Sequence, residues 1–392
     1  MVHWKEKLRA KAAAPGSRPV ARPMVLTSAA GGMVTTEAGR MVNMSSNNYL
    51  DLANAPPVRA AAAEALERYG LGLASVRFLS GTHALHLELE RATRELLHAD
   101  DCIAFGSCFD ANAGIFEALL DDGDRIVSDE LNHASIIDGV RLAKASRLRY
   151  RHCDLEDLER LLREGPGTGI TMIVTDGVFS MDGSLAPLAD LVRLAGRYGA
   201  LLMVDDSHGI GTLGATGRGT AEHFDMLGQV DIITGTYGKA LGGAMGGFVA
   251  AGREIIELLR ARSRPYLFSN PIPASLAAGV IAAMKLMQSE PLRLGRLRES
   301  TRFLRTQLAE FGFDVPAGVH PIAPVMLRDS HRTRSLVAHA RSNGVLVSGI
   351  EYPVVPRGTE RIRLQVSAGH TLEQLSTVIQ VLARGLGEMR TA

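Results

Sequence analysis

The stretch VDIITGTYGKALGGAMGGFVAAG, residues 230–252, holds two short apolar runs separated by a glycine-rich loop with one lysine. Runs this short, bounded by Gly or Asp, are typical of strands that are buried on both faces of a sheet. Four further runs of this kind precede it: CIAFGS (102–107), RIVSD (125–129), TMIVTD (171–176) and LLMVDD (201–206). Helical segments such as PVRAAAAEALERYG and HALHLELERATRELLHA alternate with the runs. This alternation predicts an α/β fold with a mainly parallel sheet covered by helices.

The chain divides into three regions that differ in how apolar runs and helical segments alternate. Residues 1–50 combine an expected helix over residues 1–13, a Pro/Gly-rich connector to Pro23 and a small β meander with Gly turns. Residues 51–285 carry the alternating pattern of a large domain. In residues 286–392, three short apolar stretches predict a smaller α+β domain with a sheet of its own. Its helices are expected at 291–311, 331–343 and 371–388.

Composition excludes several classes of partner. The 392 residues are 46% hydrophobic and 22% charged, as in globular proteins, and a formal net charge of +1 gives no sign of a nucleic-acid partner. No apolar run approaches the roughly 20 residues that a membrane span requires. Cys102, Cys108 and Cys153 have neither metal-ligand spacing nor a disulfide pattern. We therefore expect no metal, no membrane partner and a reducing, cytoplasmic location.

Five consecutive apolar runs end in small, polar or ionisable residues. In an open parallel sheet, ligands bind at the carboxyl ends of the strands. One such end would be ordinary loop chemistry, but five in succession predict one shared site. The five segments are GSCFDANAG, ELNHASIIDG, GVFSMDG, DDSHGIG and GTYGKALGG.

Two glycine-rich segments resemble nucleotide-binding motifs, but each lacks an essential part. Gly209, Gly211 and Gly214 form G-x-G-x-x-G after a strand, as in dinucleotide-binding proteins. However, GATGRGTAEHF is a poor helix start, and no acidic residue ends a second strand about 20 residues later. The lysine loop also lacks the first glycine of a P-loop, because residue 233 is Ile.

Asp205 and Lys239 together predict a different cofactor. Asp205 ends one apolar run, and Lys239 follows the next. A carboxylate deep in a cleft is normally paired, and a pyridinium nitrogen is a suitable partner. A lysine can bind an aldehyde cofactor through a Schiff base. The pair therefore predicts pyridoxal 5'-phosphate (PLP), with Lys239 as its covalent anchor.

Neighbouring residues suit the other parts of this cofactor. A phosphate is bound well by the backbone N–H groups of a helix N-terminus with hydroxyl groups nearby. Cys108 and Phe109 open an expected helix, and the Thr236 hydroxyl precedes the lysine by three residues. His133 supplies a flat ring from a strand end, which suits stacking on the cofactor.

Ten phrases, spread over nearly the whole chain, resemble those of the α-oxoamine synthases, a family of fold-type-I PLP enzymes, and most of all its glycine C-acetyltransferase branch. They are ASVRFLSGT (74–82), SCFDAN (107–112), LNHASIIDGVRL (131–142), DGVFSMDG (176–183), VDDSHGIG (204–211), GRG (217–219), GKALGG (238–243), RSRPYLFSN (262–270) and YPVVP with RIRLQVSAGHT (352–371). The resemblance implies a mainly parallel seven-stranded sheet in the large domain. It also implies a homodimer with shared active sites.

The same resemblance implies a role for each matching residue. Lys239 binds the cofactor and moves the substrate α-proton, Asp205 pairs with the pyridine nitrogen, and His133 stacks on the ring. His208 and Ser180 approach the ring oxygen. Three residues are implied to hold the phosphate: Cys108, Phe109 and Thr236.

Three further roles concern the neighbouring subunit and the substrate. Ser269, in YLFSN, is implied to reach the phosphate of the neighbouring subunit. Asn47, in SSNNYL, and Arg363, in RIRLQ, are implied to hold the amino-acid carboxylate. Arginine suits this role because its planar fork can bond both oxygens.

The implied reaction joins glycine to a short acyl-CoA, with acetyl-CoA giving 2-amino-3-oxobutanoate and CoA reversibly. The chain differs from the sequences usual in family members that transfer an acetyl group at SGTH (80–83), Gly209, Tyr237 and Glu351. These departures leave open 8-amino-7-oxononanoate synthesis from alanine and a pimeloyl thioester, or the use of another acyl-CoA. A Glu351 that faced the acyl channel would favour a short or polar acyl group. A plain aminotransferase and a regulatory PLP-binding protein without turnover are alternatives from other classes.

Overall fold

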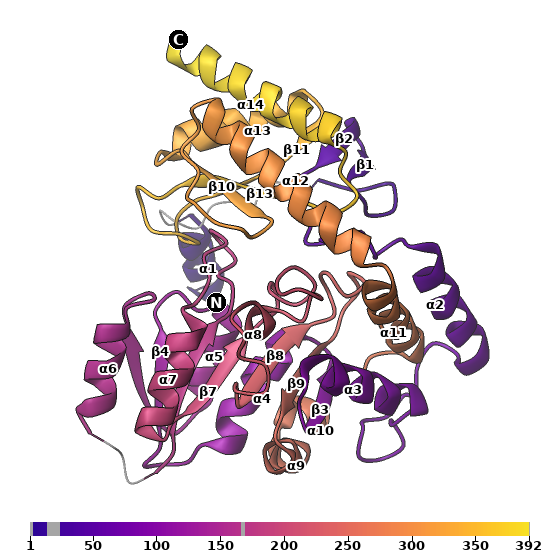
Figure 1. Ribbon diagram of the computed structural model, residues 1–392, viewed down its shortest axis with the longest axis vertical. Coiled ribbons are helices and arrows are strands. Elements are labelled where there is room, and N and C mark those ends of the chain that lie inside the picture. Colours follow the sequence, from indigo (N-terminus) through magenta and orange to yellow (C-terminus); the bar gives the residue numbers. More distant parts are fainter. Residues whose placement is uncertain (1–2, 14–23, 166–168, 392) are drawn as a thin grey trace.

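The computed structural model describes residues 3–13, 24–165 and 169–391. The connector expected before Pro23 lies outside these residues, as do the first two residues of the expected N-terminal helix. The described part contains one seven-stranded sheet and two three-stranded sheets. Figure 1 shows that helices surround the large sheet and that α12 leads from this part to the small sheets.

The large sheet has the strand order β3-β9-β8-β7-β6-β4-β5. Strands β5, β4, β6, β7 and β8 are parallel neighbours, whereas β9 runs antiparallel to both β3 and β8. The predicted α/β fold with a mainly parallel seven-stranded sheet is confirmed. The strands are β3 (Asp101–Phe105), β4 (Arg125–Asp129), β5 (Ser146–Tyr150), β6 (Thr171–Asp176), β7 (Leu201–Asp205), β8 (Ile232–Thr236) and β9 (Gly247–Ala251).

Helices cover both faces of this sheet, because successive side chains of a strand point to opposite sides. In β6, Met172 and Val174 pack in the core that includes α4 and α5, while Ile173 packs in the core that includes α6 and α7. The helices of this part are α2 (Pro56–Tyr69), α3 (Ala84–Leu97), α4 (Cys108–Leu119), α5 (Ala134–Leu142), α6 (Leu155–Arg163), α7 (Leu188–Tyr198), α8 (Thr220–His223), α9 (Arg253–Arg262), α10 (Arg264–Phe268) and α11 (Ala274–Ser289).

Strand β5 is the member of the sheet that no apolar run identified. It lies at the edge and pairs only with β4 in the large sheet. Its sequence, SRLRY, carries two arginines, and only Tyr150 is buried. An edge strand that faces water does not need the continuous apolar sequence of a central strand.

The rest of the chain builds two smaller sheets. β1 (Met33–Thr36) and β2 (Gly39–Asn43) pair with β11 (Val345–Leu346), and β13 (Arg361–Gln365) lies between β10 (Ile322–Met326) and β12 (Ser348–Ile350). The three helices predicted in this region are confirmed as α12 (Pro291–Glu310), α13 (Ser330–Ser342) and α14 (Leu372–Thr391). The first strands of the chain thus join the last part of the chain. The division into 1–50, 51–285 and 286–392 stays a prediction.

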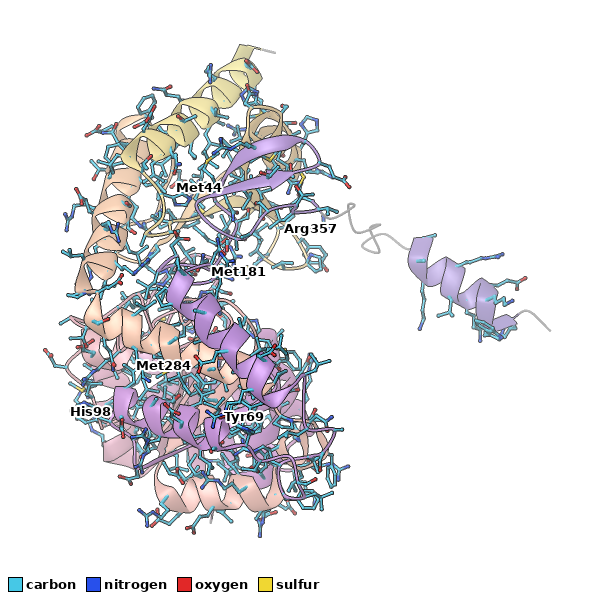
Figure 2. The ribbon with its side chains drawn as sticks, turned by 90° about the vertical axis from the view of Figure 1, so that its right-hand side faces the viewer. Met44, Tyr69, His98, Met181, Met284 and Arg357 are labelled. Atoms are coloured by element: carbon cyan, nitrogen blue, oxygen red, sulfur yellow. The ribbon has the colours of Figure 1, made fainter. Side chains whose placement is uncertain are left out.

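The N-terminal helix α1 (His3–Ala13) stands apart from the rest of the chain in Figure 2. None of its residues is buried, and Trp4 and Leu8 are exposed. None of the helices in the ranges described above is both long and apolar enough to cross a membrane.

Candidate active site

A cavity of about 230 Å³ lies at the carboxyl ends of the parallel strands. Of the nine residues predicted to bind the cofactor, eight line this cavity: Cys108, Phe109, His133, Ser180, Asp205, His208, Thr236 and Lys239. Ser269 does not; it follows α10 and is exposed. Five lining residues were not predicted: Ser107, Ser135, Asp176, Val178 and Ser207.

The ends of the strands determine where these side chains lie. β7 ends at Asp205, and β8 ends at Thr236, three residues before Lys239. His133 is the N-cap of α5, and Ser107 is the N-cap of α4. Since the strands are parallel, their carboxyl ends meet at one edge, and residues far apart in the chain share one cavity.

The start of α4 suits a phosphate group. Ser107 accepts the N–H of Asp110 at 3.0 Å, and Cys108 and Phe109 follow as the first residues of the helix. A helix N-terminus of this kind binds anions through its free N–H groups. Gly247 permits the arrangement, because a Cβ atom there would lie 2.3 Å from the nitrogen of Cys108. Thr236 lies across the cavity and lines it with its hydroxyl-bearing side chain.

Lys239 and Asp205 have the surroundings that a lysine-bound pyridine cofactor requires. Burial lowers the pKa of Lys239, although the charge of Asp205 opposes this shift. A lysine with a lowered pKa is more often a neutral amine, the form that acts as a nucleophile or base. Both Asp205 oxygens accept N–H groups, one from Ser207 at 3.0 Å and the other from Asn112 at 2.6 Å. These bonds fix the carboxylate at the end of β7.

The two predicted histidines of the site are held as neutral rings. Burial lowers the pKa of His133, and Asp205 only partly offsets this. Burial, followed by the charge of Lys239, lowers the pKa of His208 well below its ordinary value. The Nδ1 atom of His208 lies 2.8 Å from the hydroxyl of Tyr49, a fully buried residue whose pKa is raised by burial. Neutral imidazoles suit stacking and hydrogen bonding beside a ring.

Arg363 and Asn47 reach the same region from the other part of the molecule. Arg363 of β13 donates from Nη1 to the carbonyl oxygen of Ser180 at 2.9 Å, while its buried Nε has no partner among the described residues. Asn47 Oδ1 accepts from the hydroxyl of Tyr49 at 3.2 Å and from the side chain of Gln365. A buried guanidinium N–H without a partner fits an incoming carboxylate.

The residues that differ from those usual in acetyl-transferring family members are not among the residues that line the cavity. Tyr237 is buried and its hydroxyl lies 2.7 Å from that of Thr93, in the core. The side chain of His83 caps α3. A Cβ atom at Gly209 would lie 1.9 Å from Oδ1 of Asp206, which explains why glycine stands there.

Glu351 faces α13 in this structure. Its Oε1 lies 3.8 Å from Nε of Arg334, and its side chain is 16% exposed. Glu351 is not among the residues that line the cavity. Its side chain therefore does not face this cavity.

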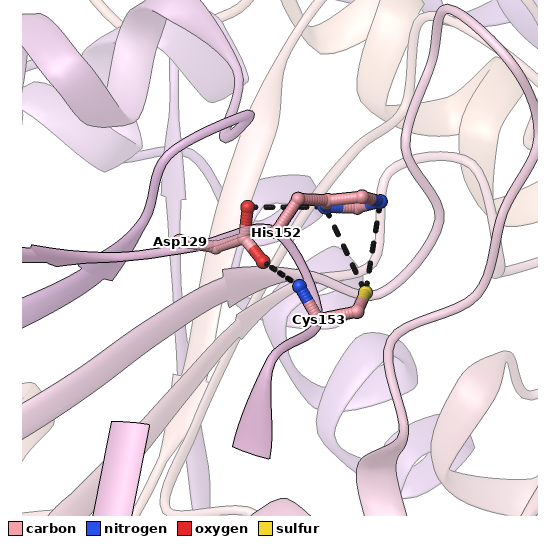
Figure 3. A group of neighbouring side chains, drawn as sticks. All are labelled: Asp129, His152 and Cys153. Atoms are coloured by element: carbon pink, nitrogen blue, oxygen red, sulfur yellow. Dashed lines mark hydrogen bonds and ion pairs between the residues drawn. The ribbon is translucent and has the colours of Figure 1, made fainter. Parts of the chain in front are cut away.

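A separate polar cluster joins Asp129, His152 and Cys153 at the ends of β4 and β5 (Figure 3). Asp129 Oδ1 lies 3.2 Å from Nδ1 of His152, and Asp129 Oδ2 accepts the N–H of Cys153 at 2.9 Å. The sulfur of Cys153 lies 3.7 Å from both ring nitrogens and faces the ring of His152. A metal would need the nitrogen lone pair, which lies in the ring plane. The cluster is therefore an ion pair between His152 and Asp129 that connects the ends of the two strands.

This cluster gives a prediction for the pH dependence of stability. Burial lowers the pKa of His152, but the hydrogen bond to Asp129 and the nearby Cys153 outweigh it and raise the pKa to about 10. Because the folded pKa exceeds the ordinary value of 6.5, the stabilisation is complete below about pH 6.5 and is lost as pH rises through about 10. Replacing His152 by Gln is expected to lower the free energy of unfolding by about 2 kcal/mol at pH 6 and by much less at pH 10. Urea unfolding of both proteins at pH 6, 8 and 10 measures this, and a difference independent of pH would contradict it.

Comparison with known proteins identifies the family. The chain matches the family Aminotransferase class I and II over residues 39–382. It is 47% identical to the 2-amino-3-ketobutyrate coenzyme A ligase of Escherichia coli (strain K12) over 363 residues, 92% of this chain and 91% of that protein. It is 44% identical to the 8-amino-7-oxononanoate synthase of Symbiobacterium thermophilum over 345 residues, 88% of each.

The fold comparison agrees with this. A variant of the serine palmitoyltransferase of S. paucimobilis, solved with a bound PLP–myriocin aldimine, has a TM-score of 0.91 and 29% identity, covering 100% of this chain and 98% of that chain. The cavity described above has the lysine, the carboxylate and the helix N-terminus that PLP needs. The chain therefore belongs to the aminotransferase class I and II family and, within it, to the α-oxoamine synthases, enzymes whose cofactor is PLP.

Proposed function

We propose that this enzyme condenses glycine with acetyl-CoA to give 2-amino-3-ketobutyrate and CoA, in a reversible reaction. The observation that carries the proposal is the 47% identity, over 92% of the chain, to a 2-amino-3-ketobutyrate coenzyme A ligase. The cavity supports the proposal because Lys239, Asp205 and the start of α4 lie together in it. We propose the cytoplasm as its location.

We assign the following work to the residues of the chain. Lys239 anchors the cofactor and, once displaced by the amino acid, takes the α-proton as a neutral amine. Arg363 and Asn47 hold the amino-acid carboxylate and so orient the α-C–H bond. Asp205 would pair with the pyridine nitrogen of bound PLP, and His133 would cover its ring. PLP, when bound, supplies the electron sink that makes the α-carbon nucleophilic.

We also propose a homodimer with shared active sites, in which Ser269 serves the neighbouring subunit. Two observations support this. Ser269 is exposed beside Phe268, which is itself 68% exposed, and α1 has no buried residue within one chain. An exposed apolar side chain that becomes covered in a dimer contributes about 25 cal/mol per Å² of apolar surface buried. Sedimentation analysis of the PLP-loaded protein at micromolar concentration tests the dimer.

A matrix of substrates tests the reaction. Glycine and alanine are each combined with acetyl-CoA and pimeloyl-CoA, and thiol release is followed. We expect glycine with acetyl-CoA to give the highest kcat/KM, by at least about tenfold, since one extra methylene group on a substrate typically changes binding in the transition state by about 1–3 kcal/mol.

The other outcomes separate the alternatives. Preference for alanine with pimeloyl-CoA would favour an 8-amino-7-oxononanoate synthase, an option kept open by the 44% identity to such an enzyme. Amino-group transfer to a 2-oxo acid without thiol release would identify an aminotransferase. No turnover with any pair, despite bound PLP, would favour a regulatory protein.

A further inference from the structure

Asn112 of α4 is fully buried and lies behind the cavity described above. Its amide nitrogen donates to Oδ2 of Asp205 at 2.6 Å and to the hydroxyl of Ser135 at 2.9 Å. Asp205 ends β7, and Ser135 lies in the first turn of α5. One amide group therefore connects three different elements of the large domain.

The direction of this amide follows from its partners. Asp205 accepts the N–H, so the reverse orientation would place the amide oxygen against a carboxylate oxygen at 2.6 Å. The Oδ1 atom of Asn112 has no partner among the described residues, although it is buried. An unpaired buried oxygen costs free energy, so the Oδ1 atom does not stabilise the fold. The two N–H bonds are what this residue provides.

The second N–H bond of Asn112 leads to His133. The Ser135 hydroxyl accepts from Asn112 and lies 2.7 Å from Nδ1 of His133, which also accepts the N–H of Ser135 at 3.3 Å. Because Nδ1 accepts, the single proton of the neutral ring sits on Nε2. The chain Asp205–Asn112–Ser135–His133 thus reaches both the carboxylate and the ring that the proposed function assigns to the cofactor.

We infer that Asn112 is a positioning residue that holds Asp205 directly and His133 through Ser135. The bond to Asp205 fixes the carboxylate that faces the pyridine nitrogen of PLP. The Ser135 hydroxyl adds a second hydrogen bond to Nδ1 of His133 and so orients the imidazole, whose tautomer is set by the backbone N–H of the same residue. This inference rests on the proposed function, because it takes its meaning from the roles of Asp205 and His133.

Substitutions at two positions separate the bond to Asp205 from the bonds that lead through Ser135 to His133, which we call the Asp205 branch and the His133 branch. Asn112→Asp keeps the shape but replaces the donor by an acceptor, so both branches are lost; Asn112→Ala does the same without adding charge. Ser135→Ala removes only the His133 branch. Asn43→Asp is the matched control, because Asn43 is also buried but bonds to the Gly31 carbonyl in another sheet.

PLP-reconstituted proteins are compared by the Kd for PLP and by the ¹⁵N chemical shift of the pyridine nitrogen of labelled PLP. The two Asn112 variants are expected to bind PLP about 10- to 100-fold more weakly, the size of losing a hydrogen bond to a charged group. They are also expected to move the ¹⁵N shift toward that of unprotonated pyridine. Ser135→Ala is expected to leave the ¹⁵N shift unchanged and to lower kcat about tenfold with little change in KM. Asn43→Asp is expected to change thermal stability alone.

Asp205→Asn decides which idea has failed if the Asn112 variants behave like the wild type. If Asp205→Asn moves the ¹⁵N shift and the Asn112 variants do not, the positioning role is overturned and the site stands. If Asp205→Asn leaves the shift unchanged too, the proposed role of Asp205 is itself wrong. Should Asn112→Asp not fold, Asn112→Ala provides the same two readouts.

Discussion

Replacement of Lys239 by alanine is expected to lower kcat by at least about 10⁴-fold, the size of effect seen when a covalent catalytic group is removed. The side chain lies in a cavity with Asp205 and His208, and burial lowers its pKa. No other lysine is among the residues that line the cavity. Neither the covalent link to PLP nor the removal of the α-proton then has a substitute.

Borohydride trapping followed by peptide mass spectrometry tests the anchor directly. Wild-type protein is expected to retain PLP on the peptide that contains residue 239, and the variant on none. Lys285→Ala serves as the control, because Lys285 is 73% exposed and pairs only loosely with Glu88 at 3.7 Å. A Lys239→Ala protein with unchanged turnover would remove the basis of the proposed reaction.

Asp205→Asn is expected to reduce kcat by about 10³-fold while the protein stays folded, an effect typical of a lost charge in a preorganised site. The asparagine can still accept at one atom from Ser207 or Asn112, so the strand end keeps its shape. What is lost is the negative charge opposite the pyridine nitrogen. Asp205→Glu, which keeps the charge, is expected to recover part of the rate. Steady-state kinetics with saturating PLP measures both, and equal rates for Asn and wild type would contradict the assignment.

The sequence predicted the central part of the fold well, because the central strands are buried on both faces. Each apolar run from 102 to 252 became a strand, and the first five were each followed by residues that line the cavity. β5 was missed for the opposite reason: its edge position allows arginines in place of apolar residues. β9 could not be placed as antiparallel, since run length and composition do not encode direction.

The inner residues of the site were predicted better than those that support them. Lys239 and Asp205 carry chemistry that the sequence shows directly. Asn112 and Tyr49 act through partners 93 and 159 positions away, Asp205 and His208 respectively. Neither residue type has a spacing rule across such distances, so only the folded chain brings these pairs together.

Tyr237 and Glu351 show that the place of a residue in the fold cannot be predicted from its position beside a motif. In the sequence, both residues differ from those usual in the family members that transfer an acetyl group, and this left open a different acyl substrate. In the fold, Tyr237 bonds Thr93 in the core and Glu351 faces Arg334. Both side chains thus have partners within the chain outside the cavity, which the sequence alone could not show.

The contact between Gly247 and the start of α4 sets a limit on how this enzyme can be redesigned. A side chain at 247 would meet the nitrogen of Cys108 and push the helix away from β9. The start of α4 is the proposed phosphate site, and β9 is the strand into which the lysine loop leads, so one substitution would disturb both the proposed phosphate site and the lysine loop. Position 247 is therefore closed to any residue larger than glycine in a redesign of cofactor affinity.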